Sequence, residues 1–280
     1  MNEATKEFLY DNSSQIDVLA QKFRNYSSGI TKTDVEHFIS QFESYINTPL
    51  GLKLLNNIEY YDGPQITTLA RDLGNHIKTI TSRNLKDVLI CPLKPNPGSS
   101  AHTTQRKLRQ TISQTPSERR RFNPKFISYD KLSALFTSNS LKKIFFVDEF
   151  IGSGDTVIKN WGHFQMWEND QHMYYVGVLV AYQDSIDIIE EETGFHFEIV
   201  ASRLLADSNR AFHPQNNIFN NSEKKILKEI CENIPNPEEH KYGHRNGQSL
   251  VIFSDQSPNN ALPLLHKPAR GWKPLFPRNF

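Results

Sequence analysis

The sequence has little cysteine and almost no net charge. Only two of its 280 residues are cysteines, Cys91 and Cys231, and they lie far apart in the chain. This content is typical of a reducing compartment and excludes both a disulfide-rich fold and a cysteine-based metal cluster. The 32 basic and 31 acidic residues nearly cancel, so the overall charge points to no particular kind of partner.

Long hydrophobic runs are also missing. No apolar stretch approaches the roughly 20 residues that cross a bilayer, and the N-terminal segment MNEATKEFLYDNSSQ lacks the apolar core of a secretory signal. The chain contains no HExxH metal motif, no GxSxG nucleophile elbow and no Walker-type phosphate loop. We therefore expect a cytoplasmic protein with no membrane partner, outside the zinc-protease, serine-hydrolase and P-loop classes.

The first part of the chain has the spacing of amphipathic helices. In residues 31–42, TKTDVEHFISQF, apolar side chains recur at helical spacing, and Thr33 followed by Glu36 predicts a capping box at the helix start. Residues 64–80 show the same period. These segments predict a helical N-terminal extension over residues 1–82.

After Ser82 the pattern changes to short apolar runs separated by helical stretches. The runs typical of buried strands are DVLICPL (87–93), KIFFVDEF (143–150), MYYVGVLVAY (173–182), FHFEIVASRL (195–204) and SLVIF (249–253). Strands that alternate with helices predict βαβ units joined by right-handed crossovers. We therefore expect an α/β domain over residues 83–280, with a mainly parallel sheet flanked by helices.

The run KIFFVDEF ends on two acids, and a glycine-rich turn follows it. In open α/β sheets ligands bind at the carboxyl ends of the strands, where Asp148 and Glu149 are expected. The turn consists of Gly152, Ser153, Gly154, Asp155 and Thr156. Its backbone N–H groups and hydroxyls can converge on an anion, so acids and turn together suit a sugar phosphate. In the alternative interpretation the acids only cap the next helix and the sheet binds nothing.

The segment IFFVDEFIGSGDT resembles the ribose-phosphate binding motif of the type I phosphoribosyltransferases. The resemblance implies a type I phosphoribosyltransferase-like sheet in which Asp148 and Glu149 contact the ribose hydroxyls of phosphoribosyl diphosphate (PRPP). It also implies that residues 152–156 wrap the 5′-phosphate, and that Mg²⁺ arrives with the phosphate substrate. Asp155 departs from the family, which usually has a small neutral residue there; either its carboxylate points away from the phosphate or the ligand differs.

The same resemblance predicts two more parts of the site. The loop after DVLICPL corresponds to the loop that grips the diphosphate, and its expected donors are Gly98, Ser99 and Ser100. The basic stretch beyond it resembles the mobile catalytic loop, whose cations would stabilise the departing diphosphate. These cations are Arg106, Lys107 and Arg109, followed by Arg119, Arg120 and Arg121. A solvated basic loop or a nucleic-acid contact is the alternative.

Several short blocks between about Gly29 and Arg278 are similar to phosphoribosyltransferase-like effectors of bacterial conflict systems, including those encoded beside retron reverse transcriptases in anti-phage defence. The blocks are ITKTDVEHFISQFE, DEFIGSG and the C-terminal GQSLVIFSDQSPNNALPLLHKPARGWKPLFPR. In that family a PNN segment follows the last strand, which implies that Asn259 and Asn260 contact a base or a ribose. A simple Pro/Asn turn is the alternative.

The function implied is that of an enzyme acting at ribose C1 of PRPP or a related nucleotide, as the toxic effector of a retron-type defence system. Its expected partners are a reverse transcriptase–nucleic acid complex or a DNA-binding protein, and it could form an oligomer. Transferase and nucleotide hydrolase both fit this chemistry. A catalytically inactive nucleotide sensor or assembly subunit and an ordinary nucleotide-salvage phosphoribosyltransferase are the alternatives.

Overall fold

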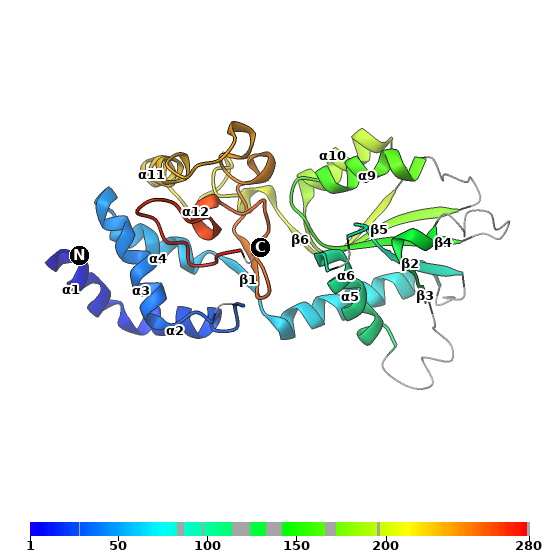
Figure 1. Ribbon diagram of the computed structural model, residues 1–280, viewed down its shortest axis with the longest axis horizontal. Helices are drawn as coiled ribbons and strands as arrows, with labels where there is room; N and C mark the ends of the chain where they lie inside the picture. Colours follow the sequence, from blue (N-terminus) through cyan, green and yellow to red (C-terminus); the bar gives the residue numbers. More distant parts are fainter. Residues whose placement is uncertain are drawn as a thin grey trace. The chain divides into compact units, whose positions relative to one another are not determined.

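The computed structural model describes residues 1–27, 29–82, 87–96, 98–113, 124–132, 142–165, 172–194 and 197–278. Contacts within the chain divide it into two units, drawn in Figure 1. One unit is Pro64–Asp207, and the other combines Met1–Gly63 with Ser208–Phe280. This division differs from the predicted boundary after Ser82, because the helix over residues 63–80 belongs with the sheet and the C-terminal part of the chain belongs with the N-terminal helices.

The unit Pro64–Asp207 is built on a parallel five-stranded sheet with the order β3-β2-β4-β5-β6. Its strands are β2 (Val88–Pro92), β3 (Lys125–Phe126), β4 (Lys143–Ile151), β5 (Met173–Tyr182) and β6 (Glu198–Leu205). Valine, isoleucine and aromatic residues dominate β4 and β5, which are buried along nearly their whole length. The structure confirms the predicted α/β class, and β4 is the central strand.

Helices cover both faces of this sheet. They are α5 (Gly63–Ile80), α6 (Ser100–Thr111), α9 (Asp155–Gln165) and α10 (Gln183–Thr193), with a short 3₁₀ turn η2 (Tyr129–Lys131). On one face, Phe146 of β4 shares a buried cluster with Ala101 of α6, Val157 of α9 and Ile189 of α10. On the other face, α5 approaches closely at Gly177, where an added Cβ would lie 3.3 Å from Leu73.

The second unit joins the two ends of the chain in one core. Its helices are α1 (Glu3–Asp11), α2 (Ser13–Phe23), α3 (Lys32–Ser40), α4 (Thr48–Asn56), α11 (Asn221–Glu232) and α12 (Pro263–His266). Its 3₁₀ turns are η1 (Gln41–Tyr45), η4 (Glu238–His240) and η5 (His244–Asn246), while η3 (Asp207–Asn209) lies where the two units meet in sequence. The rings of Phe23 and Phe276 pack edge to face, 5.0 Å apart.

The predicted strand SLVIF is confirmed as β7 (Val251–Phe253), but it does not join the five-stranded sheet. It pairs in parallel with β1 (Glu59–Tyr61), with Tyr60 opposite Ile252. These two strands come from segments far apart in the sequence, and their pairing ties the N-terminal helices to the C-terminal part of the chain.

Helix α3 begins two residues before the predicted capping box. Thr31 is the N-cap: its Oγ1 accepts a hydrogen bond from the N–H of Asp34, whose carboxylate accepts one from the N–H of Thr31. The segment TKTDVE contains two overlapping Thr-x-x-acid patterns, and the earlier one caps the helix. The predicted box of Thr33 and Glu36 is therefore wrong.

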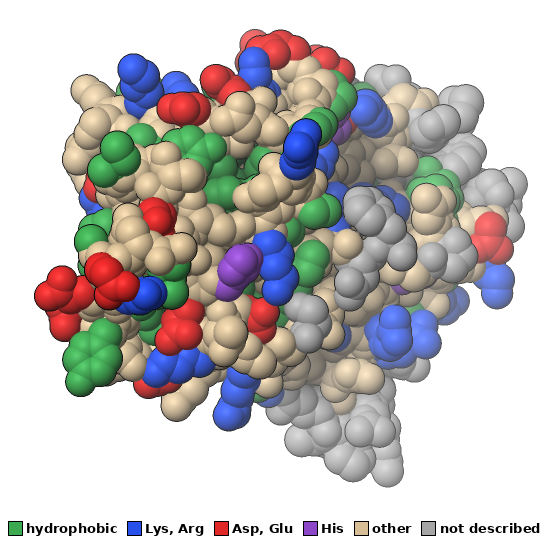
Figure 2. Space-filling model, turned by 60° about the vertical axis from the view of Figure 1, so that its left-hand side comes forward, with side chains coloured by type: hydrophobic (Ala, Val, Ile, Leu, Met, Phe, Trp, Pro, Cys, Tyr) green, Lys and Arg blue, Asp and Glu red, His purple; other side chains and the backbone are tan. Residues whose placement is uncertain are grey.

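The surface carries charges of both signs. On the face drawn in Figure 2, basic and acidic side chains are interspersed, in keeping with a formal net charge of +1. In the described part of the chain, no helix has both the length and the apolar character that a membrane crossing requires.

A buried histidine should make the second unit sensitive to acid. His266 is 2% exposed; burial, with Arg278 and Lys267 nearby, lowers its pKa from 6.5 to about 3. Between pH 6.5 and 3, His266 is protonated in the unfolded chain but neutral in the folded unit. Lowering the pH through this range therefore favours the unfolded chain, and the full free energy of unfolding is present only above pH 6.5. Within this range the free energy of unfolding falls by at most about 1.4 kcal/mol for each pH unit.

Urea unfolding at pH 7, 6, 5 and 4.5 checks this expectation, with the variant His266→Gln as the comparison. The parent protein should lose more stability than the variant over this range. Parallel curves for the two proteins would show that His266 does not set the acid sensitivity.

Candidate active site

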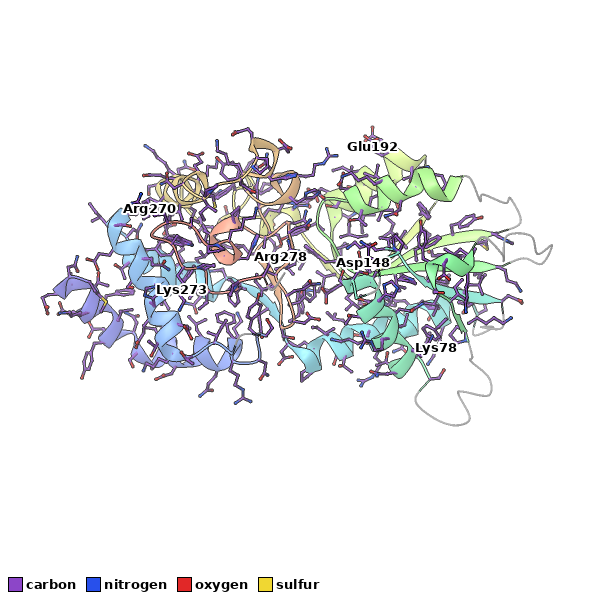
Figure 3. All side chains as sticks on the ribbon, viewed as in Figure 1. Lys78, Asp148, Glu192, Arg270, Lys273 and Arg278 are labelled. Carbon is purple, nitrogen blue, oxygen red and sulfur yellow. The ribbon has the colours of Figure 1, made fainter. Side chains whose placement is uncertain are left out.

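Asp148 lies in the central strand β4 and is 1% exposed (Figure 3). The strand pairs with β5 in a constant parallel register, with Asp148 opposite Val178 and Ile151 opposite Ala181. β4 therefore continues beyond the two acids to Ile151. The sequence pattern predicts that the strand ends on the two acids. In the structure the acids lie near the carboxyl end of β4, but the strand ends two residues after Glu149.

The two acids leave β4 towards opposite faces of the sheet. Side chains alternate along a strand with a constant register, so Asp148 shares the face of Phe146, and Glu149 shares the face of Val147. Both acids are buried, at 1% and 3% exposure. They therefore have separate surroundings.

The carboxylate of Asp148 is held by the segment that follows β2. Its Oδ1 accepts hydrogen bonds from Ser100 Oγ at 2.7 Å and from the N–H of Glu149 at 2.8 Å. Its Oδ2 forms an ion pair with Lys94 Nζ at 2.8 Å. Because β2 and β4 are neighbouring parallel strands, the segments after them emerge at the same edge of the sheet.

The sequence pattern predicts Ser100 as a diphosphate donor and gives no role to Lys94, so neither contact with Asp148 is predicted from it. The signal that could have found Lys94 is position: this residue comes two residues after β2 ends, at the carboxyl edge where ligands bind. A single cation among 32 has no periodic pattern to mark it.

The other two predicted diphosphate donors lie beside this contact. Gly98 has a left-handed φ of 86°, and nothing lies within 4 Å of the place of an added Cβ. Ser99 is the N-cap residue of α6, and its Oγ lies 3.1 Å from Nδ1 of His102. Of the three predicted donors, Ser100 is the one that contacts Asp148.

The predicted basic loop is a helix in the described residues. Arg106, Lys107 and Arg109 all lie on α6, and Arg109 sits over the ring of Phe126 at 4.8 Å. The stretch from Ser100 to Thr111 contains no glycine or proline, and its buried residues recur at helical spacing: Ala101, Thr104, Leu108 and Thr111. The loop prediction is therefore wrong for these three cations; Arg119, Arg120 and Arg121 lie outside the described residues.

The turn after β4 is shorter than predicted. It consists of Gly152, Ser153 and Gly154, and α9 begins at Asp155. The carbonyl of Gly154 accepts hydrogen bonds from Val157 and Ile158, which closes the helix start. Thr156 therefore lies in the first helical turn.

Helix α10 holds the turn in place. Ser185 Oγ donates a hydrogen bond to the carbonyl of Gly152 at 2.9 Å. Gly154 has a left-handed φ of 75°, and a Cβ there would lie 2.8 Å from Cγ1 of Ile189 and 3.2 Å from the carbonyl oxygen of Ser185. The space beside Gly154 is thus filled by α10, so the glycine is required for packing and backbone conformation.

The hydroxyls of the turn are available to a ligand. Ser153 and Thr156 are half-buried, and within the described residues neither side chain makes a hydrogen bond. Both stand at the N-terminus of α9, where the helix dipole favours negative charge. The turn therefore offers two hydroxyl donors and a favourable field for an anion.

Asp155 is neutralised within its own helix. Its Oδ2 lies 2.6 Å from Nζ of Lys159, one turn further along α9, and the residue is 8% exposed. The repulsion expected between this carboxylate and a bound phosphate is therefore weakened by an adjacent cation.

Asp155→Asn should change the affinity for ribose 5-phosphate by less than about threefold, because Lys159 is 64% exposed and its charge is screened by solvent once its partner is gone. Lys159→Met should weaken binding more, since it removes a cation and keeps the negative charge of Asp155 beside the turn. Isothermal titration calorimetry with both variants decides the matter. A tenfold gain in affinity for Asp155→Asn would mean that this carboxylate faces the ligand.

Asn259 and Asn260 belong to the other unit. The side-chain amide of Asn260 donates to the carbonyl of His244 at 3.1 Å, and the carbonyl of Asn259 accepts from the N–H of His244 at 2.8 Å. These bonds tie the PNN segment to the turn around His244, which contains the left-handed residues Arg245 and Asn246. Contact with a base or a ribose stays a prediction for both asparagines.

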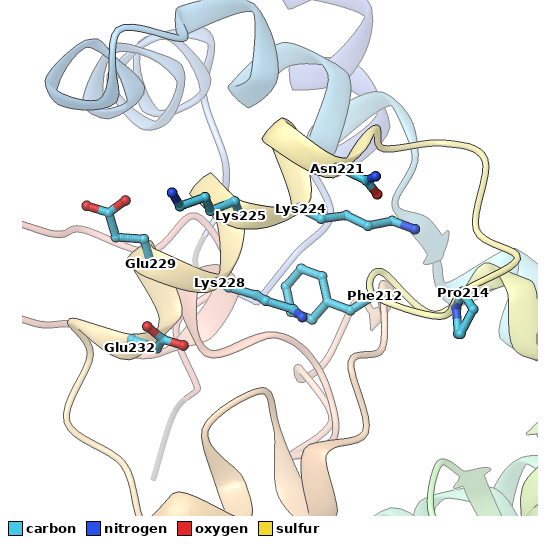
Figure 4. A pocket seen from close by; sticks show the side chains of 8 residues that line it. All are labelled: Phe212, Pro214, Asn221, Lys224, Lys225, Lys228, Glu229 and Glu232. Carbon is cyan, nitrogen blue, oxygen red and sulfur yellow. The ribbon is translucent and has the colours of Figure 1, made fainter.

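The second unit also has a surface pocket of about 690 Å³ beside α11 (Figure 4). It is lined by Phe212, Pro214, Asn221, Lys224, Lys225, Lys228, Glu229 and Glu232. Lys228 Nζ lies 5.3 Å from the centre of the Phe212 ring, and Lys224 Nζ donates to the carbonyls of His213 and Asn216. Three lysines stand beside two glutamates, so its charge does not define a ligand, and it contains none of the predicted site residues.

Neither cysteine is suited to catalysis. Both thiols are free and fully buried, and burial raises the pKa of Cys91 far above its usual range and that of Cys231 to about 12. Among the described residues, no group of three or more His, Cys, Asp and Glu side chains could hold a metal ion.

A family model named PRTase-CE matches residues 35–278, which is most of the chain. The chain belongs to the PRTase-CE family. This confirms the phosphoribosyltransferase-type identity predicted from the segment IFFVDEFIGSGDT. The association with retrons is not part of that match.

Two solved structures share a weak likeness with this PRTase-CE chain. A hypothetical protein from Neisseria gonorrhoeae with bound ppGpp is 11% identical, over 54% of this chain and 85% of that one, with a TM-score of 0.34. A hypoxanthine-guanine-xanthine phosphoribosyltransferase is 16% identical, over 55% and 84% of the two chains, with a TM-score of 0.33. With TM-scores this low, neither structure supports a conclusion about the fold of this chain, which is described from its own parallel sheet. No curated protein matches the chain.

Proposed function

We propose that this PRTase-CE protein binds PRPP, or a related ribose phosphate or nucleotide, at the carboxyl edge of the five-stranded sheet and acts at ribose C1. The observation that carries the proposal is the convergence at this edge of Asp148, Ser100 and the glycine-bracketed turn. Ser100 Oγ lies 2.7 Å from Asp148 Oδ1, although the two residues are 48 positions apart in the sequence. The turn follows the same strand as Asp148.

Each part has a proposed role. Asp148 accepts hydrogen bonds from the ribose hydroxyls, since it is an acceptor with two oxygens at the edge of the sheet. Ser153, Thr156 and the N-terminus of α9 hold the 5′-phosphate. Glu149 is the second acid, and because it leaves the opposite face of β4 we expect it to contribute less than Asp148 does.

Reaction at ribose C1 passes through an oxocarbenium-like centre, so positioning and leaving-group stabilisation supply most of the rate. Gly98 and Ser99, with the cations of α6, are the candidates for holding the leaving diphosphate. Mg²⁺ would arrive with the phosphate oxygens, and Asp148 is the one carboxylate at this face of β4 that could join them, since Glu149 leaves the opposite face. When bound, it would neutralise charge on the diphosphate.

A role as the toxic effector of a cytoplasmic anti-phage system is a narrower proposal that rests on the sequence blocks alone. It predicts growth arrest when the protein is expressed without its partners, which would include a reverse transcriptase–nucleic acid complex or a DNA-binding protein. An inactive nucleotide sensor predicts binding without turnover, and a salvage enzyme predicts a product with a free nucleobase as acceptor.

Incubation with PRPP, and separately with common nucleotides, tests the proposal when phosphorus and proton NMR follow the products. Release of diphosphate with formation of ribose 5-phosphate indicates a hydrolase, and a new anomeric signal bonded to a base indicates a transferase. The matched control is Asp148→Asn, which should form the products much more slowly than the parent protein. Failure of the parent protein to bind PRPP, ribose 5-phosphate or any nucleotide contradicts the proposal.

A further inference from the structure

The ammonium of Lys94 pairs with the carboxylate of Asp148, the same group that is proposed to accept hydrogen bonds from the ribose hydroxyls. A carboxylate has about four lone-pair positions on its two oxygens. At Asp148, Oδ1 already accepts from Ser100 Oγ and the N–H of Glu149, and Oδ2 faces Lys94 Nζ. A ribose hydroxyl that approaches Asp148 therefore meets Oδ2, where the ammonium stands 2.8 Å away.

We propose that Lys94 is a built-in competitor of the ligand: its ammonium occupies Asp148 in the free protein and leaves when ribose hydroxyls bind. This inference rests on the proposed function and deepens it, because it makes occupation of the site depend on displacing one side chain. Lys94 is then a regulatory residue of the site, in addition to the residues that contact the ligand.

The exposure of the two partners supports an exchange in this direction. The side chain of Asp148 is 2% exposed, whereas that of Lys94 is 35% exposed. The acid cannot be hydrated and needs donors at all times, but the ammonium already borders the solvent and can return to water at small cost. Within the described residues, Lys94 Nζ contacts one other side-chain oxygen, Ser100 Oγ, at the long distance of 3.5 Å.

Calorimetric titration of ribose 5-phosphate tests the competition. Lys94→Met removes the ammonium and keeps most of the side-chain volume, so affinity should rise about fivefold. Lys125→Met, at an exposed lysine on the edge strand β3, is the matched control and should leave the affinity unchanged. Unchanged or weaker binding by Lys94→Met would overturn the competitor role.

A second variant protects the test against misfolding. Removing the cation leaves a buried carboxylate with fewer donors, which lowers stability. Lys94→Gln keeps a neutral amide donor at this place and should also tighten binding, by a smaller factor. If the methionine variant does not fold, the glutamine variant decides, and a loss of affinity there counts against the proposal.

Amine acetylation followed by mass spectrometry tests the ion pair of Lys94 with Asp148 without a measurement of the affinity for ribose 5-phosphate. Lys94 should react several times faster in Asp148→Asn than in the parent protein, while Lys125 reacts equally in both. Addition of ribose 5-phosphate to the parent should speed acetylation of Lys94, since the ligand releases it. Slower or unchanged acetylation would mean that Lys94 binds the ligand or stays on Asp148, and either result overturns the proposal.

Different results would contradict the proposed function and the competitor role of Lys94. If ribose 5-phosphate binds neither the parent nor Lys94→Met, the proposed function is wrong, and the competitor role falls with it. If ribose 5-phosphate binds both with equal affinity, the proposed function stands, and the competitor role alone is wrong.

Discussion

Replacement of Asp148 by Asn should weaken the binding of ribose 5-phosphate by roughly 10- to 100-fold, the range expected when hydrogen bonds to a charged acceptor are lost. The fold should survive, because an amide oxygen can still accept from Ser100 Oγ and from the N–H of Glu149, and Lys94 can turn to solvent. Calorimetry measures the affinity, and circular dichroism confirms that the variant is folded.

Glu149→Gln is the matched control for this result. It changes the neighbouring acid on the other face of β4, and we expect a smaller loss than for Asp148→Asn. The double variant should lose binding altogether, together with any turnover or toxicity. If folded Asp148→Asn binds like the parent, Asp148 is a structural acid that only anchors the segment after β2.

The second large effect concerns the stability of the phosphate turn. Gly154→Ala should destabilise the protein by about 2–5 kcal/mol, because a side chain costs about 1–2 kcal/mol in the left-handed region and overpacking adds about 1–3 kcal/mol. The added Cβ would stand 2.8 Å from Ile189 in the buried cluster under α10. Gly154→Val should be worse and fail to fold, so its loss of binding would not identify the phosphate site.

Gly98→Ala provides a control at the same backbone conformation. Its φ of 86° carries the same conformational penalty, but no atom lies within 4 Å of the added Cβ. Its destabilisation should therefore stay near 1–2 kcal/mol. Urea unfolding of both alanine variants separates the two contributions; equal losses would show that α10 does not press on Gly154.

The sheet and its acid could be predicted from the sequence because their signals are local. Strands such as MYYVGVLVAY are marked by continuous apolar runs, and the order of strands and helices predicts a parallel sheet. That the loop after β2 and the acids of β4 gather at one edge follows from the parallel order of the strands, whereas the contact of Ser100 with Asp148 is seen only in the structure. The turn was located correctly, but its packing on Ile189 depends on a helix that no local pattern connects to it.

The division into units could not be predicted, because it depends on contacts between distant segments. The pairing of β1 with β7 and the packing of Phe23 on Phe276 bring the two ends of the chain together, and neither leaves a pattern in the sequence. The helical state of the basic stretch on α6 is hard to predict for a different reason. Its charges and the preceding prolines and glycine are typical of a loop, yet the residues from Ser100 to Thr111 include no glycine or proline.

Amide NMR during a titration with ribose 5-phosphate tests the central claim most directly, since it reports where the ligand binds. The largest shifts should fall on the backbone N–H groups of residues 152–156, with smaller shifts at Ser100 and Glu149 around Asp148. The same titration of Asp148→Asn should give weak shifts at these positions. Binding that shifts only residues of the other unit, such as those around α11 or Asn260, would contradict a ribose-phosphate site at the edge of the sheet.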